Sequence, residues 1–253
     1  MTSATQRSAI EPSSGIGSQI LEWVTTTDHK RIGILYMLTA FLFFLIAGVF
    51  ALLMRLQLAQ PDGTVLSNAT YNAVFTMHGT TMIFLVVMPL SVGLGNYLIP
   101  LMIGARDMVF PKLNMLGYWL LLFGGLFLYS SFFFGGAPDK GWFSYAPLTD
   151  IQYSPGSGMT FWALAILMLG ISSTLSSINF IVTVAQLRVP GMTLPRIPLF
   201  VWMIVVMSFL AVFAFPSLGT AALLLLFDRV IGTHFFNVDQ GGSAVLWQHL
   251  FWF

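Results

Sequence analysis

The chain of 253 residues is 57% hydrophobic and 8% charged, with a formal net charge of +1 and a mean hydropathy of +0.86. This composition is typical of multi-spanning membrane proteins and excludes a soluble domain, whose surface would need more charge. The near-zero net charge gives no field for binding nucleic acid, and the absence of cysteine excludes disulfides, iron–sulfur clusters and thiolate-bound metals within these residues.

The first 31 residues are polar and lack the apolar core and small-residue cleavage site of a secretory signal peptide. We therefore expect residues 1–31 to form an aqueous cytoplasmic tail and residues 32–253 to form one transmembrane domain. A long polar tail of this kind favours a prokaryotic plasma-membrane protein.

Five apolar runs are long enough to cross ~30 Å of hydrocarbon, which takes roughly 20 residues of helix. They cover residues 32–55, 71–100, 113–134, 158–184 and 199–227. A sixth run begins near residue 242, and its helical rise of ~18 Å would be too short to span. The pattern predicts an all-α transmembrane helix bundle of five complete helices plus the start of a sixth, in the first part of a longer protein.

The distribution of Lys and Arg predicts the orientation of this bundle. One side has Arg7, Lys30, Arg31, Arg106, Lys112, Arg188 and Arg196, whereas the other has only Arg55, Lys140 and Arg229. Because cytoplasmic loops carry the excess of positive charge, we expect the N-terminus to be cytoplasmic.

A histidine, His78, lies at membrane depth in the second apolar run, within AVFTMHGTTMIF. Such a histidine either packs against a neighbouring helix or has a functional role. Gly79, Gly93 and Gly95 leave bare patches on the same helix, where a flat ligand or another helix can approach. In a chain without cysteine, neutral imidazole is the natural axial ligand of a haem iron.

Further polar residues lie where lipid would be expected. Ser172, Ser176 and Asn179 are spaced i, i+4 and i+7 on one face of the fourth helix, beside Ser173. They indicate either close packing through small residues or a face lined with water. The cytoplasmic side adds Asn96, Asp107 and Asn114, and the whole set can hold a chain of waters that relays protons.

Other candidates have plain structural alternatives. Arg55 lies at the end of the first helix. It is either an interfacial arginine whose side chain reaches to the headgroups or a hydrogen-bond donor to a polar substituent of a haem. Trp142 and Tyr145, in an outer loop, are typical of the aromatic belt. We interpret His234 and His249 as residues that bind no metal.

At this point the chain resembles subunit I of the haem–copper oxidases, most closely the cytochrome c oxidases. The resemblance rests on TTDHKRIGILY, on MHGTTMIFLVVMPLSVGLGNYLIPLMIGARDMVFPKLNMLGYWL, on SSINFIVTVAQLRVPGMTLPRIPLFVW and on VLWQHLFWF. It covers nearly all of residues 26–253 and implies the N-terminal half of a subunit that usually has twelve transmembrane helices.

The resemblance implies roles for individual residues. By that resemblance His78 is one of two axial ligands of a low-spin haem, haem A, and Arg55 donates a hydrogen bond to the formyl group of this haem. Asp107 becomes the mouth of a D-type proton channel. The residues implied as its polar lining are Asn96, Asn114, Asn179, Ser172 and Ser173. Trp142 and Tyr145 match a segment near a second haem, and Trp252 matches a tryptophan beside the copper centre.

In that family the second axial histidine, the ligands of the second haem and the copper ligands all follow further along the chain. These residues alone are therefore not expected to assemble an oxygen-reducing centre. The resemblance implies cytochrome c, oxidase subunits II and III, oxygen and protons as partners or substrates of the whole protein, in a lipid membrane.

Two departures from the family pattern matter. Gln57 replaces a glutamate of a peripheral calcium or sodium site, which puts that site in doubt. Quinol-oxidising relatives carry Arg, Asp, His and Gln where this chain has Ile46, Phe50, Thr70 and Ala73, which favours cytochrome c as the electron donor.

The main hypothesis is thus a terminal respiratory oxidase subunit that pumps protons. Two alternatives stay open: a quinol oxidase of the same superfamily, and a cofactor-free membrane transporter in which His78 only packs.

Overall fold

The computed structural model describes residues 15–253. Residues 1–14, with Arg7 and the first part of the expected tail, lie outside the described residues. Within the described part, the chain forms helices and no strand, and this confirms the predicted all-α class.

All five predicted membrane spans are present. They are α2 (His29–Gln57), the continuous α3 (Asn68–Thr80), η1 (Thr81–Val87) and α4 (Met88–Ile103), α5 (Pro111–Ser130) with η2 (Ser131–Phe133), α6 (Gly158–Gln186), and α7 (Leu199–Val230). The sixth apolar run forms α8 (Ala244–Phe251). Short 3₁₀ turns, η3 (Leu194–Arg196) and η4 (Val238–Gln240), lie in the loops.

The structure adds one helix that the sequence analysis did not predict. Residues Ile16–Val24 form α1 inside the expected tail. The first span also begins earlier than expected, at His29, because the side chain of Asp28 accepts hydrogen bonds from Lys30 N and Arg31 N, both at 3.0 Å. Such N-caps satisfy backbone donors that a helix leaves unpaired at its start.

The second span contains a π-helical segment, η1, between α3 and α4. Its end coincides with Pro89, which has no backbone N–H and whose ring crowds the carbonyl four residues earlier. The backbone N–H of Met88 accordingly donates to Ile83 O, five residues back. Segments of this kind are frequent near functional sites, and His78 lies one turn before η1.

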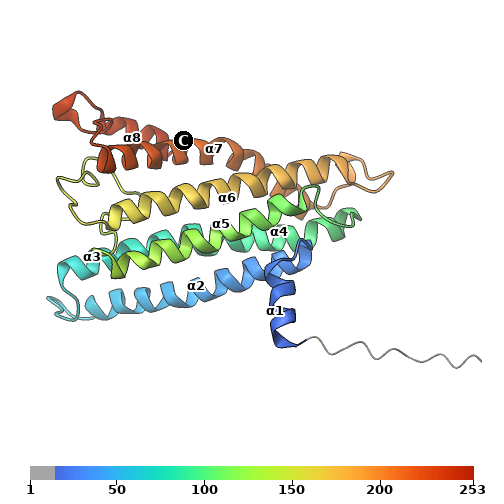
Figure 1. Ribbon diagram of the computed structural model, residues 1–253, viewed down its shortest axis with the longest axis horizontal. Helices are drawn as coiled ribbons and strands as arrows, with labels where there is room; N and C mark the ends of the chain where they lie inside the picture. The colour runs from blue at the N-terminus through green and yellow to red at the C-terminus, as the bar shows by residue number, and fades with distance from the viewer. Residues whose placement is uncertain (1–14) are drawn as a thin grey trace, which may run out of the picture.

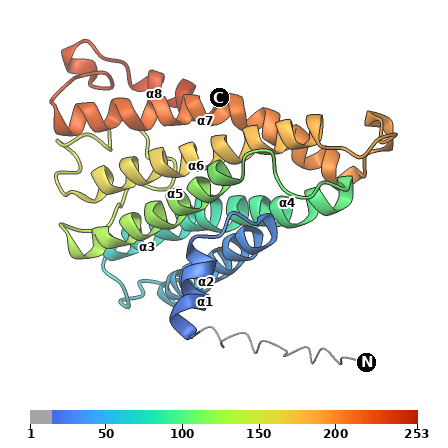
Figure 2. The same cartoon turned by 45° about the vertical axis from the view of Figure 1, so that its right-hand side comes forward.

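The helices form a layered bundle with α6 between α7 on one side and α5 on the other, while α2 covers the far side of α3 and α4 (Figures 1 and 2). Small residues permit the closest approaches: a Cβ added to Gly33 of α2 would lie 2.8 Å from Gly93 O of α4. Close contact of this kind drives association where lipid offers no hydrophobic gain.

The loops group at two ends of the bundle (Figure 1). At the end where α2 begins, which we call the N-terminal end, lie the loops 104–110 and 187–198. At the opposite end lie the loops 58–67, 134–157 and 231–243. The lysines and arginines counted above follow this division, and the cytoplasmic placement of the N-terminal end stays a prediction.

At the opposite end, Arg229 holds the long loop 134–157 against α6 and α7. Its guanidinium donates to Thr149 O at 2.6 Å, Ser154 O at 3.0 Å, Gly156 O at 2.7 Å and Thr160 Oγ1 at 3.0 Å. The preceding Asp228 accepts from Phe235 N and Phe236 N, both at 2.9 Å. The two buried charges therefore fix the loops on both sides of α7, a role that a charge count alone does not reveal.

Candidate functional site

His78 lies on α3 and is oriented by α2. Its Nδ1 is 2.9 Å from Ala47 O, and because a carbonyl oxygen only accepts, Nδ1 carries the proton. The other nitrogen, Nε2, then has a free lone pair. This is the arrangement in which most metal-binding histidines are held, with the remote N–H donated to a carbonyl or carboxylate.

The helix turn around His78 is fixed from three sides. Thr76 Oγ1 accepts from Gly141 N at 2.8 Å, and Thr80 Oγ1 accepts from Trp162 Nε1 on α6 at 3.1 Å. Between them, a Cβ on Gly79 would lie 2.9 Å from Trp142 Cδ1. Any larger residue would displace Trp142, so the outer loop and the His78 turn are in direct contact.

The predicted aromatic residues of the opposite end come together. Trp252 Nε1 donates to the Tyr145 hydroxyl at 2.7 Å, and the rings of Trp142 and Trp252 are 5.4 Å apart at an interplanar angle of 86°. Trp247, on α8, donates to Phe143 O at 2.9 Å. These contacts join α8 to the outer loop and so place Trp142, Tyr145 and Trp252 in one cluster beside His78.

Arg55 is exposed at the end of α2. It lies eight residues after Ala47, which corresponds to ~12 Å along the helix axis. Among residues 15–253, Arg55 has no hydrogen bond or ion pair, so its guanidinium is available to a further group.

Asp107 lies in the short loop between α4 and α5 at the N-terminal end. Gly104 ends α4 with a left-handed φ of 73°, and the partly buried Asp107 accepts a hydrogen bond from Met108 N at 2.7 Å. The loop therefore presents a carboxylate at the mouth of the helix bundle.

The side of this loop that follows Asp107 is attached to α6. Asn179 Oδ1 accepts from Phe110 N at 3.1 Å, and its Nδ2 donates to Phe110 O at 3.2 Å. Thr183, one turn further along α6, accepts from Val109 N at 3.1 Å. Asn179 therefore lies beside the Asp107 loop, and its amide is already occupied by the backbone.

Asn96 and Asn114 differ from Asn179. They are 0% and 1% exposed, yet Asn96 Oδ1 and both side-chain polar atoms of Asn114 have no hydrogen-bond partner. An unsatisfied buried polar group costs ~1–3 kcal/mol, and bound water is the usual remedy. These two amides mark polar space inside the N-terminal half of the bundle.

A cluster of three buried hydroxyls, from Tyr36, Ser172 and Ser176, lies deeper in the bundle. Ser172 Oγ donates to Gly117 O of α5 at 2.7 Å, Ser176 Oγ donates to Ser172 O at 3.0 Å, and the Tyr36 hydroxyl is 3.5 Å from Ser176 Oγ. Ser173 is not in this group. It lines a cavity of about 240 Å³ with Ser177 and residues of α4 and α7, so the two neighbouring serines face different helices.

Three residues of these sites, His29, Tyr36 and Thr183, were not among the candidates that the sequence suggested. His29, whose Nδ1 donates to Asn96 O at 2.8 Å, was assigned to the tail. Tyr36 was assigned to an apolar run. Thr183 continues the spacing of Ser172, Ser176 and Asn179 at i+11, and this periodicity was the signal available for it.

The sequence matches the family described as Cytochrome C and Quinol oxidase polypeptide I over residues 31–253. The chain belongs to this family. This confirms the resemblance to haem–copper oxidase subunit I and replaces the alternative of an unrelated transporter. As a member of an oxidoreductase family with five spans, it is a multi-pass integral membrane protein.

The names of the relatives give different electron donors, cytochrome c for some and a quinol for another. The chain is 50% identical to cytochrome c oxidase subunit 1 of Bacillus subtilis, over 93% of this chain and 38% of the relative. It is 45% identical to quinol oxidase subunit 1 of Bacillus spizizenii, over 91% of this chain and 36% of the relative. It is 48% identical to the haem–copper oxidase subunit I+III of Aeropyrum pernix, over 94% and 29%. The chain thus spans less than two-fifths of the length of these relatives.

Members of the family bind haem and copper, and the residues of this chain fit part of that requirement. A haem iron takes only one or two ligands from protein, and His78 offers one nitrogen in the required tautomer. Copper held by protein alone needs several ligands, and residues 15–253 contain no group of three or more His, Cys, Asp or Glu that could hold a metal ion.

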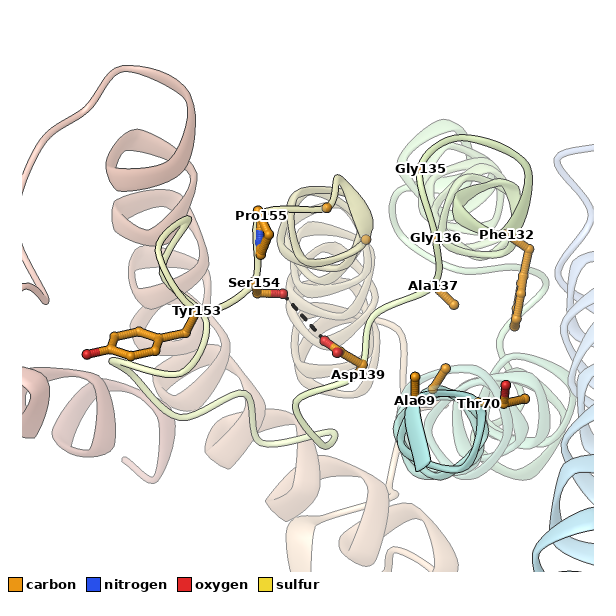
Figure 3. A pocket seen from close by; sticks show the side chains of 13 residues that line it. Ala69, Thr70, Phe132, Gly135, Gly136, Ala137, Asp139, Tyr153, Ser154 and Pro155 are labelled. Atoms are coloured by element: carbon orange, nitrogen blue, oxygen red, sulfur yellow. Dashed lines mark hydrogen bonds between the residues drawn. The ribbon is translucent and has the colours of Figure 1, made fainter. Parts of the chain in front are cut away.

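A cavity of about 440 Å³ at the opposite end is lined in part by Thr70 and Ala73 (Figure 3). At these two positions quinol-oxidising relatives are expected to carry polar residues. Thr70 and Ala73 of α3 form one wall, and across from Thr70 Figure 3 shows Asp139 hydrogen-bonded to Ser154 at 3.4 Å. Phe50 occupies a third of these positions, and its ring stacks on that of Tyr129 with ring centroids 6.2 Å apart.

The replacement of the family's glutamate by Gln57 also has a structural consequence. Gln57 accepts from Leu66 N at 2.7 Å and donates to Gly63 O, so its amide closes the loop between α2 and α3. A glutamate could not donate to Gly63 O, and we find here a loop closure in place of a carboxylate.

Proposed function

We propose that this chain is part of the catalytic subunit of a proton-pumping respiratory oxidase that oxidises cytochrome c and reduces oxygen to water. The observation that carries the proposal is the tautomer of His78, because its Nδ1–H is committed to Ala47 O and its Nε2 is left free at membrane depth. Membership of the family supports the binding of haem, and this geometry supports His78 as the residue that would bind it.

In this proposal His78 Nε2 would hold the iron of a low-spin haem of the A type. When bound, such a haem accepts and passes on single electrons. Ala47 O holds the imidazole in the correct tautomer, while Thr76 and Thr80 fix the height and rotation of the turn that carries it. Arg55 would donate to a polar substituent of the haem. Trp142, Tyr145 and Trp252 would wall the neighbouring second haem and copper, whose ligands this chain does not provide.

The same proposal gives the N-terminal half a role in proton uptake. Asp107 would take protons from water at the bundle mouth. Water bound to the unpaired Oδ1 of Asn96 and to the unpaired amide of Asn114 would pass them toward the hydroxyls of Ser172, Ser176 and Tyr36. Asn179 would mainly hold the loop, and Ser173 would join only through its separate cavity with Ser177.

Cytochrome c is proposed as the donor because the quinol-type polar set is absent. Phe50 fills its position with a ring stacked on Tyr129, and Thr70 and Ala73 offer neither an imidazole nor an amide to the cavity that they line. Subunits II and III, or segments fused as in the Aeropyrum relative's name, would complete the complex. We propose a prokaryotic plasma membrane with the N-terminus in the cytoplasm.

The replacement His78→Ala in the full-length, assembled enzyme tests the haem assignment. We expect loss of the low-spin haem band from the reduced-minus-oxidised optical spectrum. Added imidazole should restore part of the band, because the cavity left by the side chain admits the free ligand. His234→Ala, in the exposed loop 231–243, is the matched control and should leave the spectrum unchanged.

An undiminished low-spin band in His78→Ala would overturn the assignment. The donor is tested separately by steady-state oxygen consumption of the unmodified enzyme with reduced cytochrome c or with a quinol. Oxidation of the quinol alone would replace the proposed donor and leave the haem assignment intact.

A further inference from the structure

The short helix α1 has an apolar face that the rest of the described chain does not cover. Ile16 is 79% exposed, Ile20 58% and Leu21 61%, and no residue of α1 is buried. Exposed aliphatic residues in this number need a partner, because each would lose ~1.5–3 kcal/mol of burial if left in water.

The sequence of α1 is divided into two faces. At 100° per residue, its apolar side chains occupy one continuous arc, whereas Ser18 and Glu22 lie on the opposite arc. A helix of this pattern, with an aromatic residue next to its polar face, is typical of segments that lie in a membrane surface.

The position of α1 identifies which surface this is. Both views show α1 running off the bundle across the direction of the long helices, at the end where α2 begins (Figures 1 and 2). With 29 residues, α2 is ~43 Å long and exceeds the ~30 Å hydrocarbon core, so its ends reach the headgroups. Lys30 and Arg31, in the first turn of α2, are residues that mark this level.

Two contacts hold α1 at this angle. Arg31 Nη1 is 2.8 Å from Glu22 Oε1, and its guanidinium lies 5.6 Å from the centroid of the Trp23 ring. Both contacts join the polar side and the end of α1 to the first turn of α2. They leave Ile16, Ile20 and Leu21 outside the contact.

We propose that α1 is an interfacial helix that lies in the plane of the membrane and buries Ile16, Ile20 and Leu21 at the boundary of headgroups and acyl chains. The occupant of its apolar face is lipid of the same bilayer that surrounds α2. The next helix, α2, also has exposed apolar residues, including Leu38, Phe41 and Leu42, and lipid of this bilayer would cover them too. The proposal does not depend on haem, electron donor or proton uptake.

Site-directed spin labelling tests the proposal, and the absence of cysteine from these 253 residues makes it practical. We would introduce Ile20→Cys or Ser18→Cys into the complete assembled enzyme. These positions point ~160° apart on one helix turn and so form a matched pair. Each labelled enzyme is reconstituted as one complex per nanodisc of phosphatidylcholine and phosphatidylglycerol, and the unmodified enzyme reports any background labelling.

The measurement compares collisions of the label with oxygen, which concentrates in the bilayer, and with a water-soluble nickel chelate. We expect the oxygen-to-nickel ratio to be several-fold higher at position 20 than at position 18. Ile16→Cys is the second apolar variant in case Ile20→Cys disturbs the helix, and assembly of each variant is checked by size-exclusion chromatography.

Two results would overturn the proposal. Equal ratios at positions 18 and 20 would mean that α1 lies in water. Protection of position 20 from both reagents would mean that a protein surface, such as another subunit of the complex, covers the apolar face in place of lipid.

Discussion

The two halves of this helix bundle treat their buried polar groups in opposite ways. In the half that contains His78 and Arg229, side chains and backbone atoms satisfy one another, as the four hydrogen bonds of Arg229 show. In the N-terminal half, Asn96 and Asn114 contribute three of the four unpaired buried side-chain atoms of residues 15–253, the fourth being Thr149 Oγ1.

This difference distinguishes two uses of polarity in a membrane. Satisfied polar groups fix the positions of the His78 turn and of the outer loop, which a ligand site requires. Unsatisfied groups give no such rigidity, but they provide places for water, which a proton path requires. Replacement of a satisfied group should therefore reduce stability, whereas replacement of an unsatisfied group should affect transport.

The largest effect is expected at Arg229. Replacement Arg229→Met keeps most of the side-chain volume but leaves four acceptors unpaired, and should lower the free energy of unfolding by ~3–5 kcal/mol. Thermal unfolding of the purified enzyme, followed by near-UV circular dichroism, measures the loss. Arg106→Met, at an exposed loop position, is the control and should cost less than ~0.5 kcal/mol. Equal stability of both variants would contradict the contrast between the halves.

The next comparison uses two asparagines of the N-terminal half, of which Asn179 is satisfied by the backbone and Asn114 is not. Asn179→Leu removes the partner of Phe110 N and Phe110 O and should destabilise the protein by ~2 kcal/mol. Asn114→Leu removes an amide without protein partners and should change the unfolding free energy by less than ~1 kcal/mol, while it slows turnover by excluding water. Parallel measurement of melting temperature and oxygen consumption separates these outcomes. An Asn114→Leu enzyme with full turnover would exclude Asn114 from the path.

At the bundle mouth, Asp107→Asn should reduce turnover about tenfold, equivalent to ~1.4 kcal/mol of activation free energy, and should abolish proton pumping. The amide keeps the hydrogen bond with Met108 N but neither holds nor releases a proton at neutral pH. The pH change outside reconstituted vesicles measures pumping. Asp62→Asn is a matched control, because Asp62 has a positive φ of 57° that asparagine also adopts. Unchanged pumping in Asp107→Asn would refute the role.

The smallest effect is expected at Gly79. Replacement Gly79→Ala places a Cβ 2.9 Å from Trp142 Cδ1 and should cost ~1–2 kcal/mol, with a shift of the haem band if Trp142 and the His78 turn move together. In Gly219→Ala the new Cβ meets only Leu167 Cδ1 at 3.6 Å, so this control should be neutral or slightly stabilising. A normal spectrum and stability in Gly79→Ala would show that Trp142 adapts freely.

Hydropathy predicted the five spans because twenty or more apolar residues have few alternatives in a chain of this composition. The ends shifted by a few residues, as at His29, because capping by Asp28 depends on side-chain hydrogen bonds that hydropathy does not measure. The helix α1 was missed since nine residues with alternating character give no long apolar run.

The candidate site was predicted unevenly. Asn179 could be placed beside its neighbours from helical periodicity, and the cluster of Trp142, Tyr145 and Trp252 rested on resemblance alone. The separation of Ser172 from Ser173 could not be predicted, because it depends on which helix packs against each side of α6. Tyr36 was missed because a single tyrosine in an apolar run is equally typical of a lipid-facing residue.

The π segment η1 has a consequence for the angle at which its helix presents its residues. His78 and Asn96 are eighteen residues apart, which equals five whole turns of an ideal α-helix at 3.6 residues per turn and would place both on one face. Because each residue of a π turn advances less around the axis, Thr81–Val87 rotates the second half of the span relative to the first. One unbroken helix can thus direct an imidazole and a carboxamide toward different neighbours, and deletion of one residue within this segment would change the angle between these two directions.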